Sequence, residues 1–238
     1  AESFNVARDK DTTAVKVTYR FPQTDARWDI TYKVYGNGVI KVDNHFVAEN
    51  AQTPMIPRVG LRMQLPARIT SLTYYGRGPE ENYRDRRTSQ FIGEYTSGIK
   101  DMYEPYVRPQ ENNHRTDIYW CTLTDKAQEG LLFVADRTFE MNVSNYPLES
   151  LDSGDSLENG SPRTEKTNHR HLTDPQPEHS VDFFLDYRMM GVGGDNSWGA
   201  LAHEPYLIYC GKWNAIDYGF AIVPVDKKTD FKSLIYKY

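Results

Sequence analysis

The sequence predicts an all-β fold built from antiparallel sheets, and three observations support this prediction. Apolar and polar residues alternate with a period of two along most of the chain, as they do in half-buried strands. Gly, Pro and Asn separate the alternating runs, which is typical of turns between strands. Apolar residues make up 39% and aromatic residues 13% of the 238 residues, enough for a substantial core. Because all-β sandwiches often reach this length as one unit, we predict a single domain over residues 1–238.

The clearest strand patterns lie in the first part of the chain. AVKVTYRF at 14–21 and WDITYKVY at 28–35 alternate strictly. The turn Gly36-Asn37-Gly38 then leads into VIKVDNHFVA at 39–48, which predicts a hairpin because these turn residues tolerate positive φ. Further strands are expected at 59–65, 71–76, 117–124, 130–136, 139–146, 181–189, 206–211 and 216–223. Helical periodicity is almost absent, and a short helix is expected near 147–151.

Two long segments, 76–117 and 150–180, interrupt the alternation. The second segment is polar and contains Pro162, Pro175 and Pro177. Loops of this length in a compact domain usually carry function or move. We therefore expect these two segments to be functional or mobile.

The charge pattern excludes two classes of partner. The net charge is −5 and no basic block stands out, so nucleic acid is not an expected partner. The cluster Arg-Asp-Arg-Arg at 84–87 is mixed in sign and is interpreted as a solvated loop with local ion pairs. No apolar run approaches the roughly 20 residues that a membrane helix needs, so a membrane partner is not expected. The sequence does not distinguish a cytoplasmic from a periplasmic location.

The two cysteines, Cys121 and Cys210, lie far apart within strand-like runs. Their spacing predicts neither a disulfide framework nor a CxxC metal site. We therefore expect two buried free thiols.

The stretch MGVGGDNSWG at 190–199 concentrates glycines, polar residues and an indole. It is not a dinucleotide-binding motif, because the third glycine of that motif would fall on Asn196 and no helix is expected to follow. An exposed Trp198 beside Asp195 and Asn196 would offer a flat apolar face with donors and acceptors, which suits a sugar. The alternative is a structural turn in which Asp195 and Asn196 bind backbone amides and Trp198 packs in the core.

Four motifs occur together in a fixed order. They are LTYYGRGPEENYRDRRTSQFIGEY at 72–95, DMYEPYVRPQENNHRTDIYW at 101–120, NHRHL at 168–172 and MGVGGDNSWG at 190–199. In this order they resemble the C-terminal domain, or small chain, of large β-galactosidases of glycoside hydrolase family two. The resemblance covers about residues 72–199, and the flanking strands fit more loosely.

The resemblance implies an antiparallel β-supersandwich similar to the fold of aldose mutarotases. Family domains carry additional strands before the position that matches 12–19, so this chain is expected to begin inside the domain and to lack those strands. Sheet edges left unpaired in this way favour pairing between copies, so a homo-oligomer is a further expectation. In the intact family enzyme this domain is the last one and packs against a catalytic (β/α)8 barrel, the expected partner.

The resemblance also gives the glycine-rich loop a role. In the family, the Trp of this loop reaches into the active site and forms part of the platform beneath the non-galactose side of the substrate. By position this residue is Trp198, and Asp195 and Asn196 beside it are the accompanying candidates for substrate binding. The implied substrate is a terminal β-galactoside.

No catalytic residue is expected in this chain. Retaining glycosidases need two carboxyl groups about 5–5.5 Å apart, and in the family both come from the barrel. Glu80, Asn82 and Arg77 are interpreted as a network that fixes a loop. We therefore expect the isolated chain to hydrolyse no β-galactoside.

The motif YEPYVRPQENNHR supplies a second, weaker set of candidates for substrate binding. Tyr106 offers an aromatic face, and Glu111, His114 and Arg115 offer donors and acceptors. They are expected either to line a concave surface of the sandwich or to form a buried polar network that orders a long loop.

Two other functions stay open at the sequence level. In a mutarotase-like aldose epimerase, a Glu and a His would open a sugar ring by general acid–base catalysis, and Glu111, His114, His169 and His171 are the available residues. The other alternative is a stand-alone sugar-binding module.

No metal or other cofactor is assigned to this chain. His169 and His171 form an H-x-H pair, but no third ligand is apparent nearby. The resemblance implies that the parent enzyme uses a divalent metal and a monovalent cation, with their ligands on the barrel side.

Overall fold

The computed structural model describes residues 1–22, 24–48, 55–151, 157–158, 161–162, 171–196, 199–209 and 214–238. Strands dominate these residues and the helices are short, as the all-β prediction requires. No helix in the described part of the chain has the length and apolar character needed to span a membrane.

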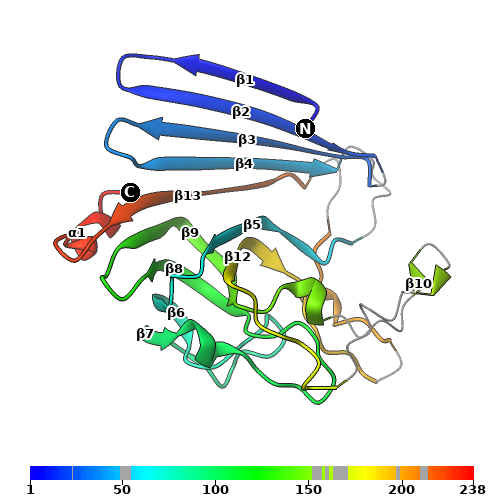
Figure 1. Ribbon diagram of the computed structural model, residues 1–238. Helices are drawn as coiled ribbons and strands as arrows, with labels where there is room; N and C mark the ends of the chain where they lie inside the picture. The colour runs from blue at the N-terminus through cyan, green and yellow to red at the C-terminus, as the bar shows by residue number, and fades with distance from the viewer. Residues whose placement is uncertain are drawn as a thin grey trace.

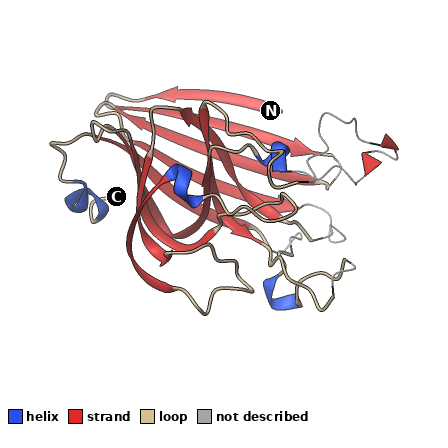
Figure 2. Cartoon of the chain, turned by 60° about the horizontal axis from the view of Figure 1, so that its bottom comes forward, coloured by secondary structure: helices blue, strands red, loops and turns tan. Residues whose placement is uncertain are grey.

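Eleven of the described strands join one antiparallel sheet (Figures 1 and 2). They are β1 (Ser3–Arg8), β2 (Thr12–Phe21), β3 (Ala26–Tyr35), β4 (Ile40–Ala48), β5 (Arg58–Pro66), β6 (Ser71–Gly78), β7 (Phe91–Gly98), β8 (Arg115–Thr124), β9 (Gly130–Ser144), β12 (Ser180–Met189) and β13 (Ile216–Val225). The main path runs β1-β2-β3-β4-β13-β9-β8-β6-β7, and β12 and β5 branch from β9. A separate ribbon pairs β10 (Leu157–Glu158) with β11 (Ser161–Pro162). The described helices are η1 (Ile99–Met102), η2 (Leu148–Leu151), η4 (Glu204–Tyr206) and α1 (Phe231–Ile235).

The sheet divides at β9, a strand of 15 residues. Residues 130–135 of β9 pair with β13, whereas residues 140–144 pair with β12. Strand β8 follows the other edge of β9, with register shifts between Ile118 and Trp120 where β9 carries extra residues. We call residues 136–138 of β9 the fork, because the two partner strands separate there. A bulge of this kind bends a strand and opens the sheet beside it.

The main core lies between the two branches that leave the fork. It includes Ile30 and Phe220 from one branch and Leu185 from the other, all at most 2% exposed. Phe133 of β9 and Phe183 of β12 meet edge to face, with 4.8 Å between their ring centroids. These contacts bury apolar surface from both branches together.

A second apolar cluster lies on the opposite face of β8, β9 and β13 and includes Trp120, Leu132 and Val223. Helix α1 covers this cluster, and Phe231 approaches Trp120 with ring centroids 5.4 Å apart. In Figure 1 this helix lies at the C-terminal end of the chain, beside the end of β13. The helix therefore shields an apolar face that the sheet would otherwise expose.

The structure confirms most of the predicted strands and corrects several others. The hairpin turn is present, with Gly38 at φ +83° and its N–H bonded to the Tyr35 carbonyl at 3.0 Å. The strands predicted at 130–136 and 139–146 are one continuous strand, because β9 keeps its pairing to β8 on both sides of the fork.

Other corrections concern elements that the sequence did not predict. Strands β1 and β7 and helix α1 were missed. The strand predicted at 206–211 is wrong over 206–209, which holds the end of η4 and a loop, and its last two residues lie outside the described residues. The short helix expected near 147–151 is a 3-10 turn, η2. Cys121 is a buried free thiol as predicted, and Cys210 lies outside the described residues.

Candidate functional site

The glycine-rich loop leaves the end of β12, and its backbone N–H groups donate hydrogen bonds that hold its base to the rest of the protein. The Met190 N–H donates to the Pro57 carbonyl at 2.8 Å. The Gly191 N–H donates to the Tyr206 carbonyl at 2.8 Å, and the Gly193 N–H donates to the Asp85 carboxylate at 2.7 Å. A Cβ atom on Gly191 would lie 2.6 Å from Cγ of Asp85. The absence of a side chain at Gly191 therefore allows the loop backbone to lie close to the Asp85 carboxylate.

The polar residues at the tip of this loop face solvent. The Asp195 carboxylate pairs with Nε2 of His203 at 2.8 Å, although the two side chains stay 80% and 65% exposed. Asn196 is also exposed. Trp198 lies outside the described residues, so its role stays a prediction.

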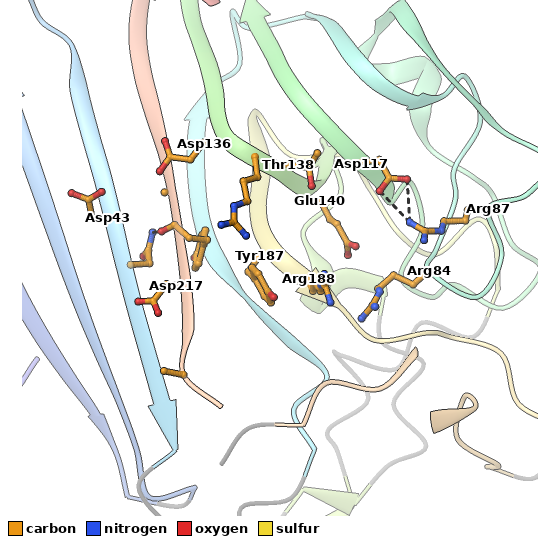
Figure 3. Close-up of a pocket in the computed structure, with 15 residues that line it drawn as sticks. Asp43, Arg84, Arg87, Asp117, Asp136, Thr138, Glu140, Tyr187, Arg188 and Asp217 are labelled. Atoms are coloured by element: carbon orange, nitrogen blue, oxygen red, sulfur yellow. Dashed lines mark hydrogen bonds and ion pairs between the residues drawn. The ribbon is translucent and has the colours of Figure 1, made fainter. Parts of the chain in front are cut away.

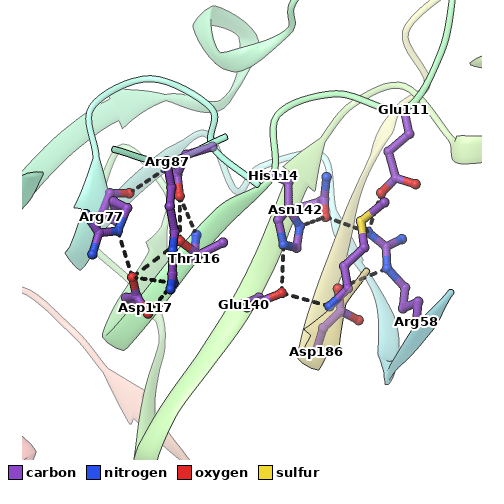
Figure 4. A network of polar contacts seen from close by, with 12 residues as sticks. Arg58, Arg77, Arg87, Glu111, His114, Thr116, Asp117, Glu140, Asn142 and Asp186 are labelled. Carbon is purple, nitrogen blue, oxygen red and sulfur yellow. Dashed lines mark hydrogen bonds and ion pairs between the residues drawn. The ribbon is translucent and has the colours of Figure 1, made fainter. Parts of the chain in front are cut away.

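The second predicted set is dominated by His114, whose side chain is almost fully buried. Its Nδ1 lies 2.7 Å from Oδ1 of Asn142 and its Nε2 lies 3.1 Å from the Glu140 carboxylate, as Figure 4 shows. The imidazole also stacks on the Tyr83 ring, with 5.2 Å between centroids. Burial lowers the pKa of His114, but the hydrogen bond and charge of Glu140, together with Asp186, outweigh it and raise the pKa above its ordinary value.

The other three members of this set also bind protein groups. Arg115 is 5% exposed and donates to Oδ1 of Asn113 at 3.1 Å and to the Pro79 carbonyl at 3.0 Å. Glu111 forms an ion pair with Arg58, and the Tyr106 hydroxyl donates to Glu81. The contacts therefore correspond to the second expectation for this motif, a buried network that orders a long loop.

Asp186 is a fully buried acidic residue in this network. Its carboxylate is 3.1 Å from Nε of Arg58 and has no exposed surface. Burial raises its pKa, and the charges of Arg58 and His114 offset only part of this rise. The net result is a pKa of about 7 for Asp186.

The loop-fixing network predicted around Asn82 is also present. The Asn82 amide donates to the carbonyls of Arg77 and Glu80, both at 3.1 Å, and its oxygen accepts from Thr116. Arg77 pairs with Asp117 at 2.7 Å. Glu80 takes part through its main chain, so its carboxylate is not the binding group.

A cavity of about 730 Å³ opens beside the fork (Figure 3). Its walls come from the fork on β9, the start of β13, the end of β12, the middle of β4 and the loop that contains Arg84 and Arg87. It forms because β13 and β12 separate at the fork and leave the space between them unfilled. Its volume lies within the range of small-molecule sites, about 300–1,000 Å³.

The cavity is lined by many charged side chains, and both of its sides carry carboxylates. Asp43 and Asp217 lie on the β4 and β13 side, whereas Arg84, Arg87 and Arg188 gather on the other side, together with Asp117 and Glu140 (Figure 3). Arg137 also lines the cavity beside Asp136. None of the second set of predicted residues, Tyr106, Glu111, His114 and Arg115, lines the cavity. His114 touches it indirectly, through Glu140.

Sequence reasoning missed this cavity, although part of its signal was visible. The cluster at 84–87 was interpreted as a solvated loop with local ion pairs. Arg86 pairs with Glu81 at 2.6 Å and Arg87 pairs with Asp117 at 3.0 Å, so that interpretation holds for two of its arginines. Arg84 differs because it is half-buried and points toward the cavity.

Within the described ranges, no group of three or more His, Cys, Asp or Glu residues is placed to hold a metal ion. His171 is exposed, and His169 lies outside the described residues.

Comparison with protein families gives a match along almost the whole chain. The family described as "Beta galactosidase small chain" matches residues 1–222. The chain belongs to the β-galactosidase small-chain family. The resemblance drawn from the four sequence motifs is thereby confirmed.

Curated β-galactosidases are the relatives of this small-chain sequence. A β-galactosidase of Priestia megaterium is 33% identical over 183 residues, which cover 77% of this chain and 16% of that protein. One from Streptococcus thermophilus is 31% identical over 199 residues, which cover 82% of this chain and 18% of that protein. The small chain thus spans less than a fifth of the length of these relatives.

Solved structures give distant likenesses. An aldose epimerase homologue from C. elegans covers 94% of this chain and 68% of its own, with 10% identity and a TM-score of 0.42. A galactose mutarotase related enzyme from Lactobacillus acidophilus covers 95% of this chain and 72% of its own, with 8% identity and a TM-score of 0.38. The family assignment therefore rests on the sequence matches.

Proposed function

We propose that this chain is the small-chain part of a β-galactosidase and that its glycine-rich loop completes the substrate cleft. The family match over residues 1–222 is the observation that carries this proposal. The matched region makes up only 16% and 18% of two relatives named β-galactosidase, which leaves room for a catalytic barrel elsewhere in such an enzyme. That barrel is the proposed partner of this chain, and the proposed reaction is hydrolysis of terminal β-galactosides.

The structure supports a binding role for the loop in two respects. Its base is fixed by the bonds from Gly191 and Gly193, so its tip is presented from a defined position. Asp195 and Asn196 are exposed at that tip and lie two to three positions before Trp198. An indole beside polar groups is a suitable surface for a sugar ring.

The carboxylates near the buried network support a non-catalytic role for this chain. A retaining glycosidase needs a nucleophile and an acid–base about 5–5.5 Å apart, both open to substrate. Glu140 is held by His114 and by the Met189 N–H, and Asp186 has no exposed surface. These two carboxylates are therefore unsuited to act as such a pair, and we assign the catalytic pair to the barrel.

The test replaces Trp198 with Ala in the complete enzyme that contains this chain. We expect kcat/KM for lactose to fall about tenfold, mostly through a higher KM, because one aromatic stacking surface is worth roughly 1–2 kcal/mol. Trp198→Phe should recover part of the loss. The matched control is Phe91→Ala, which removes an aromatic side chain that is 73% exposed on β7.

Two results would contradict this proposal. One is an unchanged kcat/KM in the Trp198→Ala enzyme. The other is turnover of a chromogenic β-galactoside by the isolated 238-residue chain, which we expect to be inactive.

A further inference from the structure

Two arginines that line the cavity at the fork form no ion pair with a carboxylate of the described residues. Arg87 is neutralised by Asp117, with contacts of 3.0 and 3.1 Å. Neither Arg84 nor Arg188 has a carboxylate within ion-pair distance among the described residues. Arg188 instead lies over the Tyr187 ring, 5.0 Å from its centroid.

Arg84 lies in a partly buried position beside other arginines, which is unusual for an arginine whose only role is to keep the surface soluble. It is half-buried, and burial together with the charges of Arg188 and Arg87 lowers its pKa, although the charge of Glu140 opposes this effect. Its backbone is fixed between Tyr83, which is 1% exposed, and Arg86, since these two residues exchange backbone hydrogen bonds of 3.2 and 2.8 Å. The protein therefore holds the guanidinium groups of Arg84 and Arg188 close together at one wall, and neither forms an ion pair among the described residues.

The charge of Glu140 offsets part of the unfavourable environment of Arg84, but this carboxylate is already bound by other groups. Glu140 is buried, its carboxylate pairs with His114, and it also accepts the Met189 N–H at 2.7 Å. An anion that entered the cavity would therefore meet unpaired guanidinium groups, which bind carboxylate and sulfate with directed hydrogen bonds.

The opposite wall is suited to hydroxyl groups. Asp136 and Asp43 are exposed carboxylates, and Asp43 also pairs with Lys33 at 3.3 Å. Burial followed by the charge of Asp43 raises the pKa of Asp136, and Lys41 opposes part of this rise. Hydroxyl donors between these groups would relieve their repulsion. The Tyr218 hydroxyl is buried and makes no hydrogen bond within the described chain, so it is a further unused polar group beside the cavity.

An aromatic surface lies between the two charged walls. The rings of Tyr187 and Tyr218 are 5.8 Å apart and inclined at 41°. Such rings can contact the C–H face of a sugar. A ligand that uses every part of the cavity would carry an anionic group at one end and several hydroxyls on a ring.

We propose that the cavity at the fork binds an acidic sugar, with its carboxylate or sulfate group on Arg84 and Arg188 and its hydroxyls toward Asp136 and Asp43. This proposal does not depend on the proposed role of Trp198 and needs no glycoside hydrolysis. It gives the small chain a binding activity of its own.

The experiment is isothermal titration calorimetry of the 238-residue chain at low ionic strength. The probes are galacturonate, galactose 6-sulfate, galactose, sodium sulfate and a short glutamate peptide. We expect one or both acidic sugars to bind about tenfold or more tightly than galactose and than sulfate alone, because charge-assisted hydrogen bonds add roughly 1.5–3 kcal/mol. The two acidic sugars together show whether the site prefers a carboxylate or a sulfate ester.

Variants connect the binding to the arginines. Arg84→Gln and Arg188→Gln should each weaken acidic-sugar binding about tenfold. The matched control is Arg68→Gln, which removes an arginine that pairs with Asp125 outside the cavity and should leave binding unchanged. Arg84→Gln should melt at the same temperature as the parent chain or higher, since it removes like-charge repulsion. Arg188 is exposed, so its variant tests the proposal independently of folding.

Several outcomes would overturn the proposal. Equal affinity for galactose and the acidic sugars would remove the role of the arginines, and equal affinity for sulfate alone would remove the role of the sugar. Binding of the glutamate peptide without the sugars would identify a protein segment as the occupant. Absence of binding, or unchanged binding in both arginine variants, would reject the site.

Discussion

At the scale of single residues, the buried charges around His114 determine how stability responds to pH. Asp186 has a pKa raised to about 7 in the folded protein, against an ordinary value of 3.8. The folded chain therefore keeps a proton that the unfolded chain releases between about pH 4 and pH 7. The pKa of His114 is also raised above 6.5, so its contribution acts in the same direction near neutral pH. Stability from these two groups is present at the lower pH and is lost as the pH rises through the folded values.

This leads to a prediction for Asp186→Asn. We expect the free energy of unfolding of the parent chain to decrease from pH 4.5 to pH 7.5 relative to that of the variant, by at most about 1.4 kcal/mol per pH unit. Urea denaturation at a series of pH values measures the difference. Parallel pH profiles for the two proteins would show that Asp186 does not hold a proton in the fold. Asp125→Asn is a suitable control, because this carboxylate lies on a surface loop and its pKa is lowered, not raised.

The residues that could be identified from the sequence are those marked by a local motif. Asn82 and Arg77 lie close together in sequence, and their network was predicted from that proximity. Arg84 and Arg188 are 104 positions apart, and no local pattern shows that their side chains face the same cavity. His114 could be named as a polar candidate, but its burial depends on Tyr83 and Glu140, which reach it through the fold.

At the scale of elements, the alternation of apolar and polar residues predicted the strands that have one buried face and one exposed face. Strand β9 was divided into two because Asp136, Arg137 and Thr138 break its apolar pattern. They are exposed at the fork, where the strand is bent and no partner covers that edge. Strand β1 was missed because all six of its residues are exposed, so no buried face imposes a pattern.

Gly60 lies where strands β5 and β12 approach each other closely, and this contact can be tested. A Cβ atom on Gly60 would overlap the Asp186 carboxylate and lie 2.7 Å from the Asp186 Cα on the paired strand. Gly60→Ala should therefore lower the free energy of unfolding by about 2–3 kcal/mol, because the backbone of β12 has to move. Gly36→Ala is the control, since nothing lies within 4 Å of its added Cβ, and it should change stability by less than about 1 kcal/mol. Chemical denaturation of both variants is the measurement, and equal effects would contradict the proposed close approach.

At the scale of the whole molecule, the all-β class and the family could be predicted, whereas the arrangement of the strands could not. The order in which strands pair depends on contacts between distant segments, such as β13 lying between β4 and β9. Helix α1 lies beyond the residues that match the family and was not expected. Its apolar residues Phe231, Leu234 and Ile235 are too few to show helical periodicity, yet they cover the apolar face around Trp120.

Strand β9 belongs to both branches of the sheet. We therefore expect the two branches to unfold together. Unfolding of one branch would remove a paired strand from β9 and expose the main core around Phe133 to water. Differential scanning calorimetry should therefore record one heat-absorption peak whose calorimetric and van't Hoff enthalpies agree. Two separated peaks would mean that the chain consists of independently folding units, contrary to the single domain expected over residues 1–238.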